Sequence, residues 1–244
     1  TVASVSSHSD GFKSSISGPG IGNYITVAKC VSDAEKILGL KKLRNNTFVH
    51  AHGTGTPANR TTESHILNEV AATYGIKSWP VAGIKSFLGH SMAPASGDQL
   101  VTALGTWNKG VIPGIHSTET VADDVFDENL EILLENKVED DNFYSAAFLN
   151  AKGFGGNNAS AGIISPNKAM DLAKKEFSAS DLKKYADKKE KVLETSEKYQ
   201  NDCRKGEYKV IYRFNEEVLE GLDDIEISDK GIQLKGFPHP IKFN

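Results

Sequence analysis

Short apolar runs alternate with longer amphipathic runs through the first two thirds of the chain, and this pattern most limits the possible folds. Apolar residues at helical spacing predict three helices, at residues 23–40, 62–74 and 96–108, with Gly39 ending the first. Short apolar runs predict four strands, at TFVHAHG from Thr47 and at residues 81–84, 143–149 and 159–164. Strands that alternate with helices predict an α/β fold built on a sheet.

The composition changes near residue 166, because 18 of the 22 glycines precede it and Lys, Glu and Asp dominate the C-terminal remainder. We therefore expect one domain at residues 1–166 and an extension at 167–244. In the extension we expect a charged helix from Ser178 to Lys205, a strand at YKVIYRF, and a hairpin formed by IEIS and IQLK around Asp229. A solvated helix beside a small sheet explains this region; an assembly module is the alternative.

Charge and cysteine content exclude several classes of protein. The net charge is −4 and the pI about 6.0, so there is no overall attraction for nucleic acid or an anionic membrane. No apolar run approaches the roughly 20 residues of a membrane span, and the N-terminus lacks the regions of a signal peptide. Cys30 and Cys203 lie far apart and favour free thiols. We expect a soluble cytoplasmic protein, and the start at Thr1 suggests a fragment.

HGTGTP places an imidazole, that of His52, at the end of a predicted buried strand. The small residues after it let a ligand approach the backbone closely. The hydroxyls of Thr54 and Thr56 suit hydrogen bonds to an amide-bearing ligand, although ordinary turn capping explains them nearly as well.

IKSFLGH places Lys85 and His90 five residues apart, just after a short predicted strand. A surface lysine and an ordinary loop histidine are the plain interpretation. Glu63, in the helix after HGTGTP, would pair with Lys85 if the two loops converge, and such clusters of ionisable groups favour active sites. No HExxH, CxxC or carboxylate cluster is present, so we expect no metal site.

KGFGGNNA is a glycine-rich turn around Phe154 that precedes a predicted strand. A dinucleotide-binding loop would precede a helix instead. An aromatic side chain on glycine hinges suggests a gate, and a hairpin with a core phenylalanine is the alternative.

Together with SDG at Ser9, these motifs resemble, in order and spacing, the C-terminal half of the β-ketoacyl-[acyl-carrier-protein] synthases, which are condensing enzymes of the thiolase superfamily. The resemblance covers residues 9–166. It implies a thiolase-like layered αβαβα fold of which this chain forms the second half, followed by a small α+β extension.

The resemblance also implies roles for individual residues. His52 and His90 match the two active-site histidines, which assist decarboxylation of the malonyl thioester. Lys85 matches the family's supporting lysine, and Glu63 its carboxylate partner. The substrate-binding residues that it implies are Thr54 and Thr56, which hold the phosphopantetheine arm, and the gating Phe154 with Gly155.

Two positions depart from the family pattern. Arg60 stands where the family commonly has an aspartate, which changes the expected salt bridges of that loop. The family's nucleophilic cysteine belongs to an N-terminal segment that this sequence does not contain, and neither Cys30 nor Cys203 matches it.

The resemblance implies an acyltransferase of fatty-acid or polyketide synthesis that acts as part of a longer chain or complex, with this chain alone inactive. Its partners would be acyl carrier protein, acyl and malonyl thioesters, the missing N-terminal half and a second copy in a homodimer. No cofactor is implied, since the carrier protein brings the phosphopantetheine. A non-catalytic partner similar to chain-length factors, or a docking fragment, is the alternative.

Overall fold

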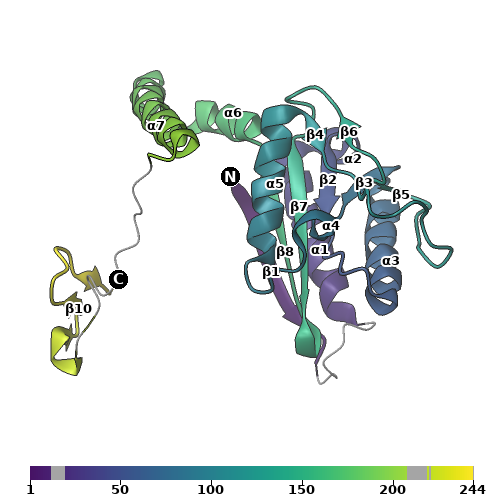
Figure 1. Cartoon of the computed structure of the whole chain (residues 1–244), viewed down its shortest axis with the longest axis horizontal. Coiled ribbons are helices and arrows are strands. Elements are labelled where there is room, and N and C mark those ends of the chain that lie inside the picture. The colour runs from purple at the N-terminus through teal and green to yellow at the C-terminus, as the bar shows by residue number, and fades with distance from the viewer. Residues whose placement is uncertain (12–19, 208–218, 220, 244) are drawn as a thin grey trace. The chain divides into compact units, whose positions relative to one another are not determined.

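The computed structural model describes residues 1–11, 20–207, 219 and 221–243, and divides the chain into two compact units (Figure 1). The first unit is Thr1–Ala179 and the second is Ser180–Asn244. The last strand of the first unit's sheet ends at Ile164, and a helix follows it within the same unit. The domain boundary that we placed at residue 166 stays a prediction.

A six-stranded mixed sheet forms the centre of the first unit, in the order β1-β8-β7-β2-β3-β5. Its strands are β1 (Val2–Ser9), β2 (Thr47–His50), β3 (Trp79–Ala82), β5 (Leu130–Ile132), β7 (Ala146–Gly153) and β8 (Asn157–Ile164). Strands β7, β2, β3 and β5 run parallel, whereas β8 and β1 pair antiparallel. A separate two-stranded sheet joins β4 (Val111–Ile112) to β6 (Lys137–Val138).

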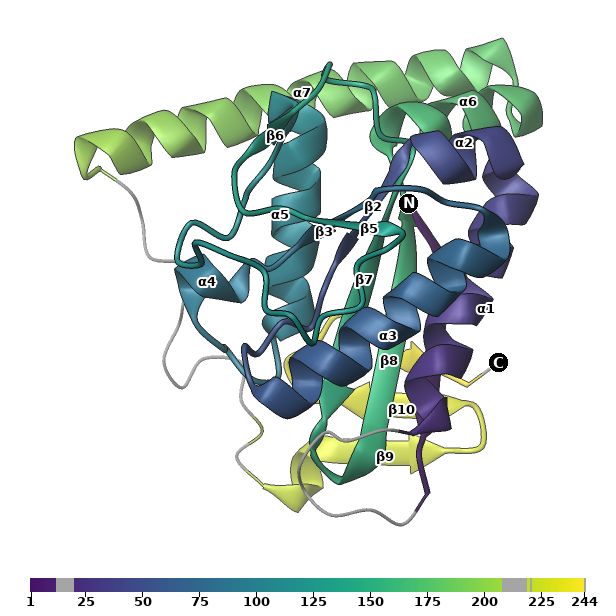
Figure 2. The same ribbon diagram turned by 90° about the vertical axis from the view of Figure 1, so that its right-hand side faces the viewer.

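Helices cover both faces of the six-stranded sheet, as Figure 2 shows, with α5 on one side and α1 and α3 on the other. The helices of this unit are α1 (Ile21–Leu38), α2 (Leu40–Asn45), α3 (Pro57–Tyr74), α4 (Lys85–Leu88), α5 (Ala95–Lys109) and α6 (Pro166–Glu176). One apolar core includes residues of α1 and α3 with Trp79 and Phe148, and a second includes Phe48, Trp107 and Leu149. Two cores, one on each face, confirm the predicted α/β class.

The helices and strands predicted for residues 1–166 are present, with shifted ends. Helix α3 begins at Pro57 rather than Thr62, because proline suits the first helical turn, where its missing N–H needs no partner. Strand β3 begins at Trp79 rather than Val81. Strand β1 was missed: it is an edge strand in which serines interrupt the apolar residues.

The second unit contains the predicted charged helix and hairpin. Helix α7 spans Ala179–Lys205, and none of its side chains is buried. Strands β9 (Ile225–Ser228) and β10 (Gly231–Leu234) form the hairpin, and β11 (Ile241–Lys242) adds a third strand. The YKVIYRF segment, for which we predicted a strand, lies outside the described residues.

Candidate active site

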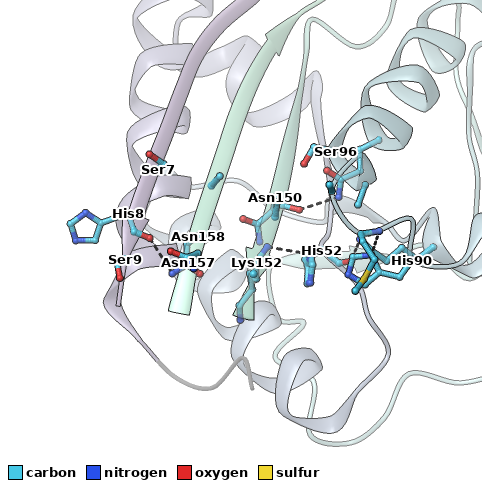
Figure 3. A pocket seen from close by; sticks show the side chains of 18 residues that line it. Ser7, His8, Ser9, His52, His90, Ser96, Asn150, Lys152, Asn157 and Asn158 are labelled. Carbon is cyan, nitrogen blue, oxygen red and sulfur yellow. Dashed lines mark hydrogen bonds between the residues drawn. The ribbon is translucent and has the colours of Figure 1, made fainter. Parts of the chain in front are cut away.

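Three sequence motifs meet at one edge of the sheet because β2, β3 and β7 are parallel and adjacent. HGTGTP follows β2, KSFLGH follows β3, and KGFGG lies at the end of β7. The carboxyl ends of parallel strands are where α/β proteins place their ligand sites. A cavity of about 580 Å³ opens there, and Figure 3 shows His52, His90, Asn150 and Lys152 around it.

His52 is buried, and its Nδ1 atom accepts a hydrogen bond of 3.2 Å from the backbone N–H of Lys152. A neutral imidazole has one donor and one acceptor nitrogen, so its Nε2 carries the proton. Burial lowers the pKa of His52 to about 4; the negative charge of Glu63 opposes this change, and the positive charges of Lys85 and Lys152 add to it. His52 is therefore a neutral Nε2–H donor near pH 7.

His90 lies on the exposed loop after α4, and its Nδ1 accepts a hydrogen bond of 3.1 Å from the backbone N–H of Met92. Its Nε2 therefore carries the proton, and is a donor, when the ring is neutral. The two histidine rings meet edge to face, with centroids 5.4 Å apart. The structure thus brings together the two histidines that the motifs singled out.

Glu63 is buried beneath the HGTGTP loop and accepts four hydrogen bonds. Its Oε1 atom accepts from the backbone N–H of His52 at 2.6 Å and from Asn150 Nδ2 at 2.7 Å. Its Oε2 atom accepts from the backbone N–H of Gly53 and from Asn59 Nδ2, both at 2.9 Å. The carboxylate therefore anchors the backbone that carries His52.

Lys85, at the start of α4, donates from Nζ to the backbone carbonyl of His52 at 2.5 Å. Burial lowers the pKa of Lys85, and the negative charges of Glu63 and Asp98 oppose that change. The two loops converge as the pairing of Lys85 with Glu63 required, but the described side chains form no direct ion pair with each other. The two side chains bind the carbonyl and the N–H of the same residue, His52, and act on each other through space.

The predicted substrate-binding residues lie around the two glycine-rich loops. The hydroxyls of Thr54 and Thr56 are 3.4 Å apart. Thr54 lines a second cavity, of about 420 Å³, which shares Lys85 and His90 with the first.

Phe154 sits at the β7–β8 turn with 69% of its surface exposed, and Gly155 beside it has a φ of 75°, which favours glycine. Phe154 does not pack in a core, so the alternative interpretation of a core phenylalanine is wrong.

Arg60, the departure from the family pattern, forms a two-pronged ion pair with Asp124. Its Nε and Nη2 atoms donate to the two carboxylate oxygens at 2.7 and 2.9 Å. The pair connects α3 to the loop before β5.

Cys30 lies in α1 and is fully buried, with its Sγ atom donating to the carbonyl of Ser160 at 3.2 Å. Burial raises the pKa of its thiol. A nucleophilic cysteine needs access and a stabilised thiolate, and Cys30 has neither. The structure agrees with the sequence in giving Cys30 a structural role.

Asn150 and Gln99 are among the site residues that the sequence motifs did not single out. Asn150 binds Glu63 and also Asn23, and Gln99 on α5 donates from Nε2 to the carbonyls of Ala51 and Asn150. The sequence does contain a signal for both residues, which is a polar side chain at a position expected to be buried. Asn150 interrupts an apolar strand, and Gln99 lies on the buried face of α5. Polar side chains buried in this way are normally hydrogen-bonded, and here those bonds fix the loop after β2.

Within the part of the chain that the structure describes, no group of three or more His, Cys, Asp and Glu side chains is placed to hold a metal ion. Among the same residues, no helix has the length and apolar character needed to cross a membrane.

The layered fold and the two histidines at its sheet edge define a thiolase-like ketosynthase fold. Residues 2–119 match the family model for the beta-ketoacyl synthase C-terminal domain. The resemblance to the C-terminal part of the beta-ketoacyl synthases that the motifs predicted is therefore confirmed.

Two comparisons define how far the likeness extends. The chain is 42% identical over 242 residues to the beta-ketoacyl-[acyl-carrier-protein] synthase FabY of Pseudomonas aeruginosa, covering 99% of this chain and 38% of that protein. The crystal structure of that ketosynthase matches with a TM-score of 0.88 over 100% of this chain and 38% of its own. The ishigamide ketosynthase/chain length factor matches at 26% identity and a TM-score of 0.54, over 67% of this chain and 37% of its own. The chain thus spans well under half the length of these relatives.

Proposed function

We propose that this chain supplies the histidine half of the active site of a β-ketoacyl-[acyl-carrier-protein] synthase. One observation carries the proposal: both histidine rings accept a backbone N–H at Nδ1, which leaves two Nε2–H donors beside one cavity. Preorganised donors of this kind stabilise the negative charge that develops on a thioester oxygen. The name of the Pseudomonas aeruginosa relative supports the same activity.

In the proposed reaction, the malonyl thioester loses its carboxylate as CO₂, and the electron pair of the broken C–C bond forms an enolate. The Nε2–H groups of His52 and His90 donate to the enolate oxygen. The enolate carbon then attacks the thioester carbonyl of an acyl group held on a cysteine. A C–C bond forms, the cysteine leaves as thiolate, and the product is a 3-oxoacyl thioester.

The proposal places the nucleophilic cysteine outside residues 1–244, since Cys30 is buried and Cys203 matches no nucleophile motif. Residues 1–244 alone are then inactive in condensation. We further propose that acyl carrier protein delivers the malonyl thioester, that the working enzyme is a homodimer in the cytoplasm, and that it needs no cofactor of its own. A carrier-delivered substrate would bring the phosphopantetheine that Thr54 and Thr56 hold, with Phe154 and Gly155 forming the gate.

The test is formation of 3-oxoacyl product from malonyl and acyl thioesters by the complete protein and by residues 1–244 alone. Product from the complete protein only, with loss of decarboxylation in His52→Ala, supports the proposal. Robust turnover by residues 1–244 that Cys30→Ser abolishes would overturn the assignment of the nucleophile. A complete protein that neither condenses nor decarboxylates would favour the non-catalytic partner.

A further inference from the structure

Lys152 is a buried lysine at the active-site cavity to which the sequence motifs assign no role. It lies near the end of β7, opposite Asn158 of β8, with only 7% of its surface exposed. Lysines are almost never so fully buried without a specific partner. Its Nζ donates to Thr62 Oγ1 on α3 at 2.9 Å, so the ammonium is held beneath the cavity that the residue lines.

The same residue also contacts His52 through its backbone, because its N–H donates to His52 Nδ1. Protonation of Nδ1 would set an N–H of the ring against the N–H of Lys152. That arrangement has two donors and no acceptor, so the charged ring loses a hydrogen bond that the neutral ring keeps.

The charged groups that act on His52 are Glu63, Lys85, His90 and Lys152. Glu63 is the only negative group in this set, and the two lysines outnumber it. A positive neighbour disfavours the imidazolium form, and the effect is strong where water is excluded. The ammonium and the backbone N–H of Lys152 therefore favour the same protonation state of His52.

We propose that Lys152 is a positioning residue for His52: its backbone N–H orients the ring by binding Nδ1, and its ammonium, which contacts Thr62, disfavours a second proton on that ring. The inference rests on the proposed function only for what His52 does to substrate. The protonation state itself is a property of this chain's own residues and can be measured without turnover.

The experiment is an NMR titration of His52 in the complete protein with isotope-labelled histidine, its signal assigned by its loss in His52→Gln. Lys152→Met removes the charge and keeps the aliphatic stem, Lys152→Arg keeps the charge, and Thr62→Val removes one hydrogen-bond partner of Nζ. Lys41→Met, on the exposed surface of α2, is the control for loss of a lysine charge elsewhere. Lys152→Gln replaces the methionine variant if that protein fails to fold.

We expect the midpoint of the His52 titration to rise in Lys152→Met, by less than about one pH unit because burial is the larger cause of the lowered pKa. The midpoint should stay near the wild-type value in Lys152→Arg and Lys41→Met, and rise by a smaller amount in Thr62→Val. An unchanged midpoint in Lys152→Met overturns the inference. An equal rise in Lys152→Arg also overturns it, because charge would then not be the cause.

Malonyl decarboxylation, followed as CO₂ release between pH 4 and 8, is the second measurement. If the wild type decarboxylates, the acid limb of the Lys152→Met profile should move to higher pH together with the NMR midpoint. If the wild type releases no CO₂, the proposed function fails while the titration still decides the role of Lys152. The two failures are therefore distinguishable.

Discussion

Glu63 Oε1 accepts a hydrogen bond of 2.6 Å from the backbone N–H of His52, so a carboxylate on helix α3 holds the peptide that carries the first histidine. Lys85 binds the carbonyl of the same residue from the other side. The negative side chain of Glu63 and the positive side chain of Lys85 therefore both bind the backbone of His52 and do not bind each other.

Glu63→Ala, Lys85→Ala and the double variant should therefore show non-additive losses of condensing activity. Each single substitution removes one of the two side chains that hold the His52 backbone, so the second substitution adds little further loss. The interaction free energy between the two residues should be about 0.5 to 3 kcal/mol. The measurement is a double-mutant cycle on kcat/KM in the complete protein. Glu69→Ala, an exposed carboxylate on the same helix, is the control. Strictly additive losses would show that the two residues act independently.

His52→Ala and His90→Ala should each slow malonyl decarboxylation more than acyl transfer to the nucleophile, since oxyanion charge develops mainly in decarboxylation. Loss of one preorganised donor lowers a rate by about 10²- to 10³-fold. CO₂ release and formation of the acyl enzyme are measured separately, with the exposed His239→Ala as control. Normal decarboxylation combined with failed acylation would assign the histidines to the other half-reaction.

The protein should lose stability as the pH falls from about 6.5 toward 4, in part through His50. This residue of β2 is fully buried, neither of its ring nitrogens has a hydrogen-bond partner in the described structure, and burial lowers its pKa to about 4. The unfolded chain binds a proton in that range and the folded chain does not, so acid favours unfolding. The stabilisation is complete above about pH 6.5 and is lost as the pH falls to the folded-state value.

For His50 alone the loss at pH 5 relative to pH 7 is about 2 kcal/mol. Denaturant unfolding at the two pH values measures it, and His50→Leu should reduce the difference by about that amount. An identical pH dependence in wild type and His50→Leu would refute the assignment.

Cys30 should resist alkylation by iodoacetamide in the folded protein, because its thiol is buried and its pKa is raised. Cys203, which is partly exposed, is the internal control and should react. Mass spectrometry of native and unfolded samples distinguishes the two. Cys30→Ala should also leave the condensation rate of the complete protein unchanged, and loss of the acyl enzyme in that variant would make Cys30 the nucleophile.

Much of the fold and of the site could be predicted from local sequence. The alternation of apolar runs predicted the α/β class, and Gly39 ends α1 as expected, with a φ of 74°. His52 and His90 were singled out because their motifs match those of the condensing enzymes in order and spacing, and the structure places the two rings together. Strand β1 was missed because an edge strand buries too little to show an apolar run, and Lys152 because a lone lysine normally indicates the surface.

The amino-acid sequence by itself determined which elements form and which loops carry imidazole, ammonium and carboxylate groups, because helical and strand periodicity and glycine turns are local properties. Only the tertiary structure decided which atoms meet. Glu63 binds the N–H of His52 rather than Lys85, and Lys152 reaches His52 across 100 residues of sequence. These contacts depend on the parallel pairing of β2 with β7 and on the packing of α3 over the sheet edge. This strand pairing and this helix packing are set by burial of the two apolar cores. Local sequence patterns do not encode such contacts between distant segments.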